Sequence, residues 1–141
     1  GIQMSKLILC VDDEPSNLDY LREDANAMNI PPPTMYYLNS AEEAKLLFEH
    51  PTEIFHDPHL ELLVITDQNM PGMSGFELAE LVKERFPRAL RGIVLHSFTT
   101  DPNLAAAMER ACKRQGIEFC AKGTTAGRTQ IRTRMRQFMD A

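Results

Sequence analysis

The stretch VITDQNMPGMSG, residues Val64–Gly75, is the most informative part of this sequence. Its apolar run ends in one carboxylate, Asp67, and a turn rich in proline and glycine follows directly. Such a run is typical of a strand buried in a parallel sheet. In open α/β sheets, ligands bind beyond the carboxyl ends of the strands. Asp67 is therefore predicted to lie at a binding edge, as a nucleophile or a metal ligand.

Apolar runs of this kind recur along the chain. Five of them are expected to form strands, at Lys6–Val11, Thr34–Leu38, Glu61–Thr66, Gly92–Ser97 and Glu118–Ala121. Between them the apolar residues follow helical spacing, and strands that alternate with helices indicate parallel βαβ units. We expect an α/β fold of the flavodoxin-like type, which is a doubly wound (βα)₅ domain with a parallel five-stranded sheet in the order 2-1-3-4-5.

The expected helices carry their own boundary signals. Ser40 and Ser74 each precede a glutamate by three residues, which is the capping-box pattern. Asp101 is a good N-cap because a proline follows it, and Gly116 stands where a left-handed C-cap belongs. The helix between these two residues is expected to pack through four apolar side chains: Leu104, Met108, Ala111 and Cys112.

Size and composition indicate one domain. The chain has 141 residues, and its 43% of hydrophobic and 25% of charged residues are ordinary for a globular domain. No apolar run approaches the roughly 20 residues that span a membrane, and no secretory signal is visible. We expect a cytoplasmic protein with three free cysteines and no membrane partner. Residues 1–3 resemble a cloning remnant, which leaves residues 4–141 as a single domain.

Charge is unevenly distributed along the chain. The net charge of −5 divides into −9 over residues 1–120 and +4 over residues 121–141. An acidic body disfavours direct binding of nucleic acid. Within the basic end, Arg128, Arg132 and Arg136 recur every four residues along the last expected helix. They are interpreted either as a solvated face or as a surface for docking or dimerisation.

Acidic residues also follow the first strand, at Asp12 and Asp13. Right-handed crossovers in such a sheet bring the ends of the first and third strands together, so both residues are expected to lie near Asp67. Three ionised carboxylates at close range repel each other, and a hard divalent cation relieves the repulsion. The all-oxygen site predicts Mg²⁺, with Mn²⁺ as an alternative.

Two more polar residues end the remaining strands. The fourth strand ends in Ser97, and Lys122 follows the fifth. A carboxylate, a metal, a hydroxyl and an ammonium group together suit phosphoryl transfer, because the cations neutralise phosphoryl oxygens while the hydroxyl donates to one of them. The covalent product would be an aspartyl phosphate on Asp67.

These residues resemble the receiver domain of two-component response regulators, such as the chemotaxis regulators. The resemblance covers residues 6–141 and rests on four motifs in the family's order: VDDEP at Val11–Pro15, DQNMPGMSG at Asp67–Gly75, Ser97 and Lys122. It implies a phosphorylation-dependent signalling switch, in which Asp67 accepts a phosphoryl group from a sensor histidine kinase or a phosphotransfer protein.

For the metal, the resemblance implies a set of oxygen ligands. Asp13 and Asp67 would bind Mg²⁺ directly, and the backbone carbonyl of Asn69 would be a third protein ligand. Asp12 would act mainly through water. The family phosphorylates itself and slowly dephosphorylates itself, and it turns over no free substrate, so no further enzyme activity is expected.

For the switch, the resemblance implies that Ser97 and Lys122 contact the phosphoryl group. Phe119 corresponds to the family's switch aromatic, whose ring fills the space left when the Ser97 hydroxyl moves inward. The surface formed by the fourth helix, the fifth strand and the last helix would then change. That surface is expected to control a downstream protein or output domain, and it could also form a homodimer.

Two departures from the family pattern adjoin the site. Phe98 stands where a small residue is usual, and it is expected to narrow access for small phosphodonors and for water. Gly123 stands where the family commonly has a proline after a cis bond. A cis bond before glycine costs about 2.5–4 kcal/mol, so either a trans bond with a re-routed loop or a strained cis bond is expected. Neighbouring His96 is interpreted as a satisfied core or helix-facing histidine.

Two other functions are weighed against the switch. An Asp-nucleophile phosphatase of the haloacid dehalogenase type needs a second aspartate two residues after the first, as a general acid. Asn69 occupies that position here and cannot supply the proton. A phospho-independent adaptor is the second alternative, and the complete set of site residues argues against it.

Overall fold

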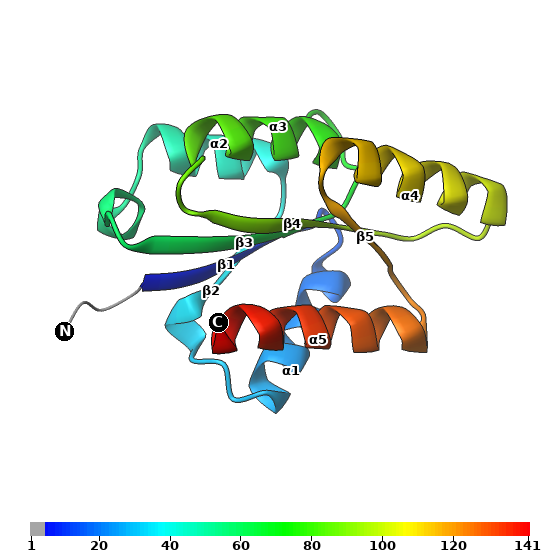
Figure 1. Cartoon of the computed structure of the whole chain (residues 1–141), viewed down its shortest axis with the longest axis horizontal. Helices are drawn as coiled ribbons and strands as arrows, with labels where there is room; N and C mark the ends of the chain where they lie inside the picture. Colours follow the sequence, from blue (N-terminus) through cyan, green and yellow to red (C-terminus); the bar gives the residue numbers. More distant parts are fainter. Residues whose placement is uncertain (1–4) are drawn as a thin grey trace.

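The structure is a computed structural model that describes residues 5–141. The proposed cloning remnant at residues 1–3 lies outside this range. Five strands form one parallel sheet in the order β2-β1-β3-β4-β5, as expected (Figure 1). The strands are β1 (Ser5–Val11), β2 (Met35–Leu38), β3 (Leu60–Thr66), β4 (Leu90–Ser97) and β5 (Glu118–Ala121). The helices are α1 (Pro15–Ala27), α2 (Ala41–Glu49), α3 (Gly75–Arg85), α4 (Pro102–Gln115) and α5 (Thr125–Asp140).

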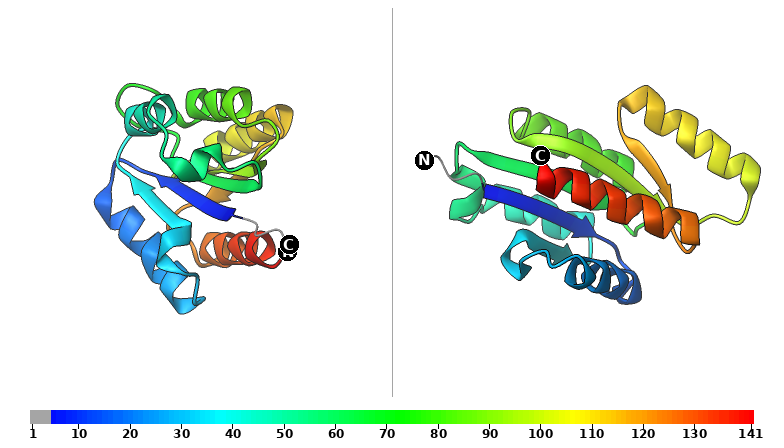
Figure 2. Two further views of the ribbon diagram at one scale, coloured as in Figure 1. Left: turned by 90° about the vertical axis from the view of Figure 1, so that its left-hand side faces the viewer. Right: turned by 60° about the horizontal axis from the view of Figure 1, so that its bottom comes forward.

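Helices cover both faces of the sheet. Helices α2, α3 and α4 lie on one face, and α1 and α5 lie on the other (Figures 1 and 2). Alternate residues of each strand enter the two cores: Leu9 and Leu95 pack on the α2–α4 side, and Cys10 and Val94 pack on the α1–α5 side. The fold prediction is therefore confirmed, because buried apolar strands with two covered faces are what a doubly wound sheet requires.

The register of the central strands positions the site. β1 and β3 pair along their whole length, with Val11 opposite Thr66. The residues that follow, Asp12 and Asp67, therefore leave the sheet at the same level. The backbone N–H of Asp67 donates to the Val11 carbonyl at 2.9 Å, which fixes the two strand ends together.

Most boundary signals are confirmed. Ser74 and Glu77 form a complete capping box at α3, Asp101 caps α4, and Gly116 ends α4 with a left-handed φ of 69°. Ser40 caps α2, but its backbone N–H does not donate the reciprocal bond to Glu43, because the Glu43 carboxylate accepts from the Asn39 N–H instead. Half of the predicted capping box is thus wrong.

Four strands begin at other residues than predicted, and the first of them, β1, starts one residue early, at Ser5. Strand β2 starts at Met35 because Thr34 belongs to a 3₁₀ turn that also contains Pro32 and Pro33. Strand β3 starts one residue early, at Leu60, and β4 starts two residues early, at Leu90. The β4 difference accompanies a register shift against β3, which pairs Leu62 with Leu90 before the regular ladder resumes.

Helix α4 packs less than its apolar spacing predicts. Cys112 is its one buried residue, while Leu104 is 50% exposed. In Figure 1 its N-terminal end extends beyond the strands, so the four-residue face is only partly buried. Across residues 5–141, no helix has both the length and the apolar character to cross a membrane.

Candidate functional site

A cavity of about 670 Å³ opens at the carboxyl ends of the strands. This is where ligands bind in open α/β sheets, and the volume lies within the usual range for ligand pockets. Predicted site residues from four loops share its wall: Asp13, Asp67, Asn69, Ser97, Phe98 and Lys122.

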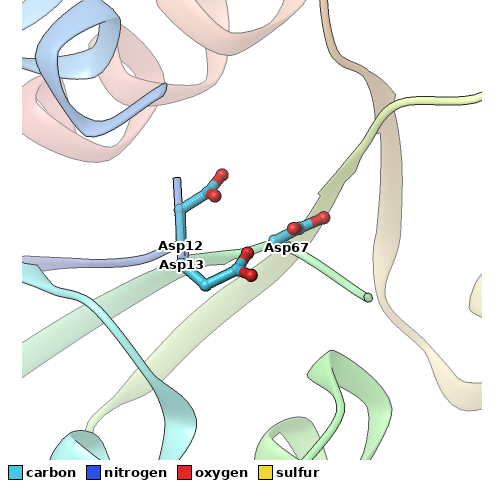
Figure 3. A group of neighbouring side chains, drawn as sticks. All are labelled: Asp12, Asp13 and Asp67. Atoms are coloured by element: carbon cyan, nitrogen blue, oxygen red, sulfur yellow. The ribbon is translucent and has the colours of Figure 1, made fainter. Parts of the chain in front are cut away.

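The three predicted carboxylates lie together. Asp12, Asp13 and Asp67 gather at the ends of β1 and β3, with one oxygen of each within 4.8 Å of the others (Figure 3). Asp12 and Asp67 are buried, and Asp13 is partly exposed. An all-oxygen group of this kind fits a hard divalent cation such as Mg²⁺. In the described part of the chain, it is the one cluster of this composition.

Lys122 crosses from the end of β5 to the acidic cluster. Its Nζ lies 2.6 Å from Asp12 Oδ2 and 3.4 Å from Asp67 Oδ1. The other Asp12 oxygen accepts from the Glu14 backbone N–H at 2.9 Å. Both oxygens of Asp12 thus have partners in the protein. This leaves Asp13 and Asp67 as the better placed pair for direct metal binding.

Electrostatics also favour a bound cation. Burial raises the pKa of Asp67 above its ordinary value; the Lys122 ammonium opposes this shift, and the Asp12 carboxylate adds to it. A raised pKa means that the ionised carboxylate is destabilised in its site. A divalent cation would lower that pKa by stabilising the charged form.

The Ser97 hydroxyl is buried without a partner. Ser97 is 0% exposed, and its Oγ makes no hydrogen bond to any residue between 5 and 141. Buried polar atoms are normally paired, so an orphan hydroxyl at a binding edge suggests a missing acceptor. Phe119, from β5, is partly buried and packs against the core on the α2–α4 side. It lies opposite Leu95, two residues before Ser97, so both predicted switch residues belong to this side.

The loop after Asp67 is held close to the sheet. We name residues 68–74 the β3–α3 loop. The Gln68 carbonyl accepts from the Gly75 N–H at 3.1 Å, and its side-chain Oε1 accepts from the Phe76 N–H at 2.9 Å. A Cβ on Gly75 would overlap the carbonyl of Asp67, so only glycine allows this approach. Asn69 is thereby kept at the cavity wall.

Comparisons with known proteins agree with this fold. No family model matches the sequence. Hydrogenase transcriptional regulatory protein HoxA of Cupriavidus necator is 30% identical over 109 residues, which are 74% of this chain and 19% of HoxA. The response regulator receiver protein from Pseudomonas putida has a TM-score of 0.65 at 24% identity, covering 95% of this chain and 99% of that one. Chemotaxis response regulator CheY4 of Vibrio cholerae has a TM-score of 0.64 at 21% identity, over 95% and 98%. This chain has the receiver-domain fold.

The two departures from the receiver pattern touch each other. No cis peptide bond occurs in residues 5–141, so the bond before Gly123 is trans, and the loop turns there with a φ of 82°. A Cβ at this position would lie 3.4 Å from the Phe98 ring, which rests against the loop and is 61% exposed. Of the two expected bond geometries, the trans bond is the correct one. Phe98 stands at the rim of the cavity, not inside it.

The receiver cavity continues between α1 and α5, where sequence reasoning missed Asp24. Asp24 is 2% exposed, and its Oδ1 accepts from Arg128 Nε at 3.0 Å and from Arg132 Nε at 2.6 Å. Two members of the predicted arginine stripe are therefore bound within the domain. Asp24 could have been found, because its spacing from Leu21 places it on the buried face of α1.

His96 belongs to the same part of the cavity. It lines the cavity on the α1–α5 side, and its buried Nδ1 has no hydrogen-bond partner among the described residues. Burial is the main cause that lowers its pKa to about 4, and the Lys122 ammonium contributes in the same direction. The expectation of a helix-facing histidine is confirmed, but the expectation of a satisfied one is wrong.

Proposed function

We propose that this domain is a phosphorylation-dependent signalling switch, with Asp67 as the phospho-acceptor. The observation that carries the proposal is the convergence of three groups on one cavity: the acidic cluster, the Lys122 ammonium and the unpaired Ser97 hydroxyl. A phosphoryl group on Asp67 would give the orphan hydroxyl an acceptor. It would also give Lys122 a stronger anionic partner than either carboxylate.

Each residue has a distinct part in the transfer. One Asp67 oxygen attacks the phosphorus of a phosphohistidine, the bond from phosphorus to nitrogen breaks, and the released imidazole takes a proton from solvent. Lys122 neutralises charge on the transferring group. Asp13, Asp67 and the Asn69 carbonyl would hold Mg²⁺, which supplies further neutralisation of phosphoryl oxygens. Asp12 keeps Lys122 in position through the 2.6 Å ion pair.

The response would begin at Ser97. When its hydroxyl turns toward the phosphoryl oxygens, space opens beside Phe119 on the α2–α4 side of the sheet. Helix α4 is suited to follow such a change, because Cys112 is its one buried residue. The surface formed by α4, β5 and α5 would then present a different shape to a downstream protein, to an output domain or to a second copy of the chain.

The exposed Phe98 ring would set the rate of the reaction with small phosphodonors. It lines the cavity beside Gly123, so its removal should speed both labelling by acetyl phosphate and hydrolysis of the acyl phosphate. Time courses of Phe98→Ala and of the unchanged protein provide the test. Equal rates in the two proteins would contradict a gating role.

The central test uses intact mass after incubation with Mg²⁺ and acetyl phosphate. The unchanged protein should gain one phosphoryl group, and Asp67→Asn should gain none. Asp19→Asn is the matched control, since Asp19 is an exposed acid on α1 whose one ion pair among the described residues is with Arg22 on the surface. Labelling of Asp67→Asn to the same extent would refute the assignment.

The same samples separate the alternative functions. Turnover of a generic phosphomonoester would favour the phosphatase, although Asn69 lacks the proton that the leaving group needs. A partner that binds Asp67→Asn and the phosphorylated protein equally would favour a phospho-independent adaptor. We infer that the phosphodonor is a histidine kinase or a phosphotransfer protein, and that the domain turns over no free substrate.

A further inference from the structure

Glu42 is an exposed acid on the first turn of α2, and it contacts the β3–α3 loop from outside. Its Oε1 accepts a hydrogen bond from the backbone N–H of Met73 at 2.7 Å. The preceding residue, Gly72, has a left-handed φ of 78°, and a Cβ there would overlap the Glu42 carboxylate. Gly72 and Met73 therefore both adopt backbone positions that accommodate the Glu42 carboxylate.

The β3–α3 loop is thus anchored at two points. At its start, Gln68 binds the first turn of α3. At its end, Glu42 holds Met73 from α2, which lies beside α3 (Figure 1). Asn69 lies between the two anchors. The Met73 N–H lowers the pKa of the Glu42 carboxyl, so the second anchor is a charge-assisted hydrogen bond.

We propose that Glu42 is a positioning residue for the metal site: by anchoring the β3–α3 loop, it keeps the Asn69 backbone beside Asp13 and Asp67 before a cation binds. This rests on the proposed function, since it takes the acidic cluster and the Asn69 carbonyl as the metal site. A free loop would have to become ordered when the cation binds, and that ordering would weaken affinity. An anchored loop avoids this loss.

The test measures the dissociation constant of Mg²⁺ by calorimetry on the full chain, and thermal unfolding in EDTA. Glu42→Asp keeps the charge but shortens the reach to Met73, and Glu42→Gln keeps an acceptor at full reach. Glu43→Gln is the control, because it removes an equal charge from the same helical turn without touching the loop. A group bonded directly to a ligand typically contributes about 10–100-fold to metal affinity, and an anchor one step further away should contribute about threefold to tenfold.

We expect Glu42→Asp to raise the dissociation constant by that factor, Glu42→Gln to raise it less, and Glu43→Gln to leave it unchanged. Equal Mg²⁺ affinity in Glu42→Asp and the unchanged protein would overturn the positioning role. Equal loss of Mg²⁺ affinity in Glu42→Gln and Glu43→Gln would overturn it too, because the effect would then come from the removed charge and not from the anchor. A lower melting temperature in EDTA with unchanged affinity would reduce Glu42 to a structural residue. If the unchanged protein binds no Mg²⁺, the proposed function itself fails.

Discussion

Replacing Asp67 with asparagine should stabilise the metal-free fold while it abolishes phosphorylation. Each carboxylate of the cluster lies within 4.8 Å of the others, and at that distance two unit charges repel by about 3.5 kcal/mol when the effective dielectric constant is about 20. The attraction between Lys122 and Asp67, at 3.4 Å, is about 5 kcal/mol on the same basis. Burial is the largest cause that raises the pKa of Asp67, and together with the repulsion from Asp12 it outweighs the attraction of the Lys122 ammonium, so the ionised carboxylate is destabilised in the fold.

Two corrections reduce the net effect. Asp13 is partly exposed, so solvent screens its share of the repulsion. Asparagine keeps an oxygen that can accept from the Gln68 N–H, a bond of 2.8 Å in the structure, so that contact is retained. We expect a gain of about 1 kcal/mol, which raises the melting temperature by roughly 3 °C for a domain of this size.

The assay is thermal unfolding in EDTA and in excess Mg²⁺. In EDTA, Asp67→Asn should have the higher melting temperature. Mg²⁺ at about 100 times its dissociation constant should stabilise the unchanged protein by about 2.7 kcal/mol, so that the unchanged protein then has the higher melting temperature. Because burial raises the pKa of Asp67 in the folded state, the destabilisation develops as pH rises from the ordinary carboxyl pKa through the raised folded pKa, and the two proteins should converge only as pH falls below the ordinary value. A lower melting temperature for Asp67→Asn in EDTA would refute this balance of charges.

Three further changes probe other parts of the domain. Arg128→Ala combined with Arg132→Ala leaves the buried Asp24 carboxylate unpaired and should lower the free energy of unfolding by about 3 kcal/mol, measured by urea denaturation; an unchanged midpoint would contradict the pairing. Ser97→Ala removes a hydroxyl that has no partner within residues 5–141, so stability should change by less than about 0.5 kcal/mol, while the response of oligomeric state or partner binding to beryllofluoride is lost. Gly127→Ala should lower the free energy of unfolding by about 2 kcal/mol, because its Cβ would overlap the carbonyl at the end of β5. Helix propensity alone predicts a gain in stability, and such a gain would contradict the overlap by showing that the helix can shift.

The parts that the sequence predicts well are those encoded by neighbouring residues. An apolar run that ends in an acidic residue predicts a buried strand and places that residue at the carboxyl edge of the sheet. The acidic cluster and the strand order can therefore be inferred together. The side chains of Ser97 and Lys122 are expected at the same edge for the same reason. The structure brings these groups together at one cavity, and their roles in phosphoryl transfer stay predictions.

What the sequence does not predict depends on how distant elements pack. Glu42 meets a backbone N–H 31 residues away, and Arg132 meets Asp24 across 108 residues. Neither contact leaves a periodic pattern, because each involves one side chain whose partner is set by the angle between two elements. Leu104 shows the opposite error: its spacing predicts burial, but α4 has no cover over that turn.

Strand alternation divides the site between the two faces of the sheet. Lys122 and His96 follow the α1–α5 side, on which Cys120 and Val94 are buried, whereas Ser97 continues the side of Leu95. Under the proposed function, substitutions around Lys122 and His96 would change the rate of phosphorylation. Substitutions around Ser97 would change the response that is passed to a partner. The rate of phosphorylation and the response to it would then vary almost independently, because their residues lie on opposite faces of the sheet.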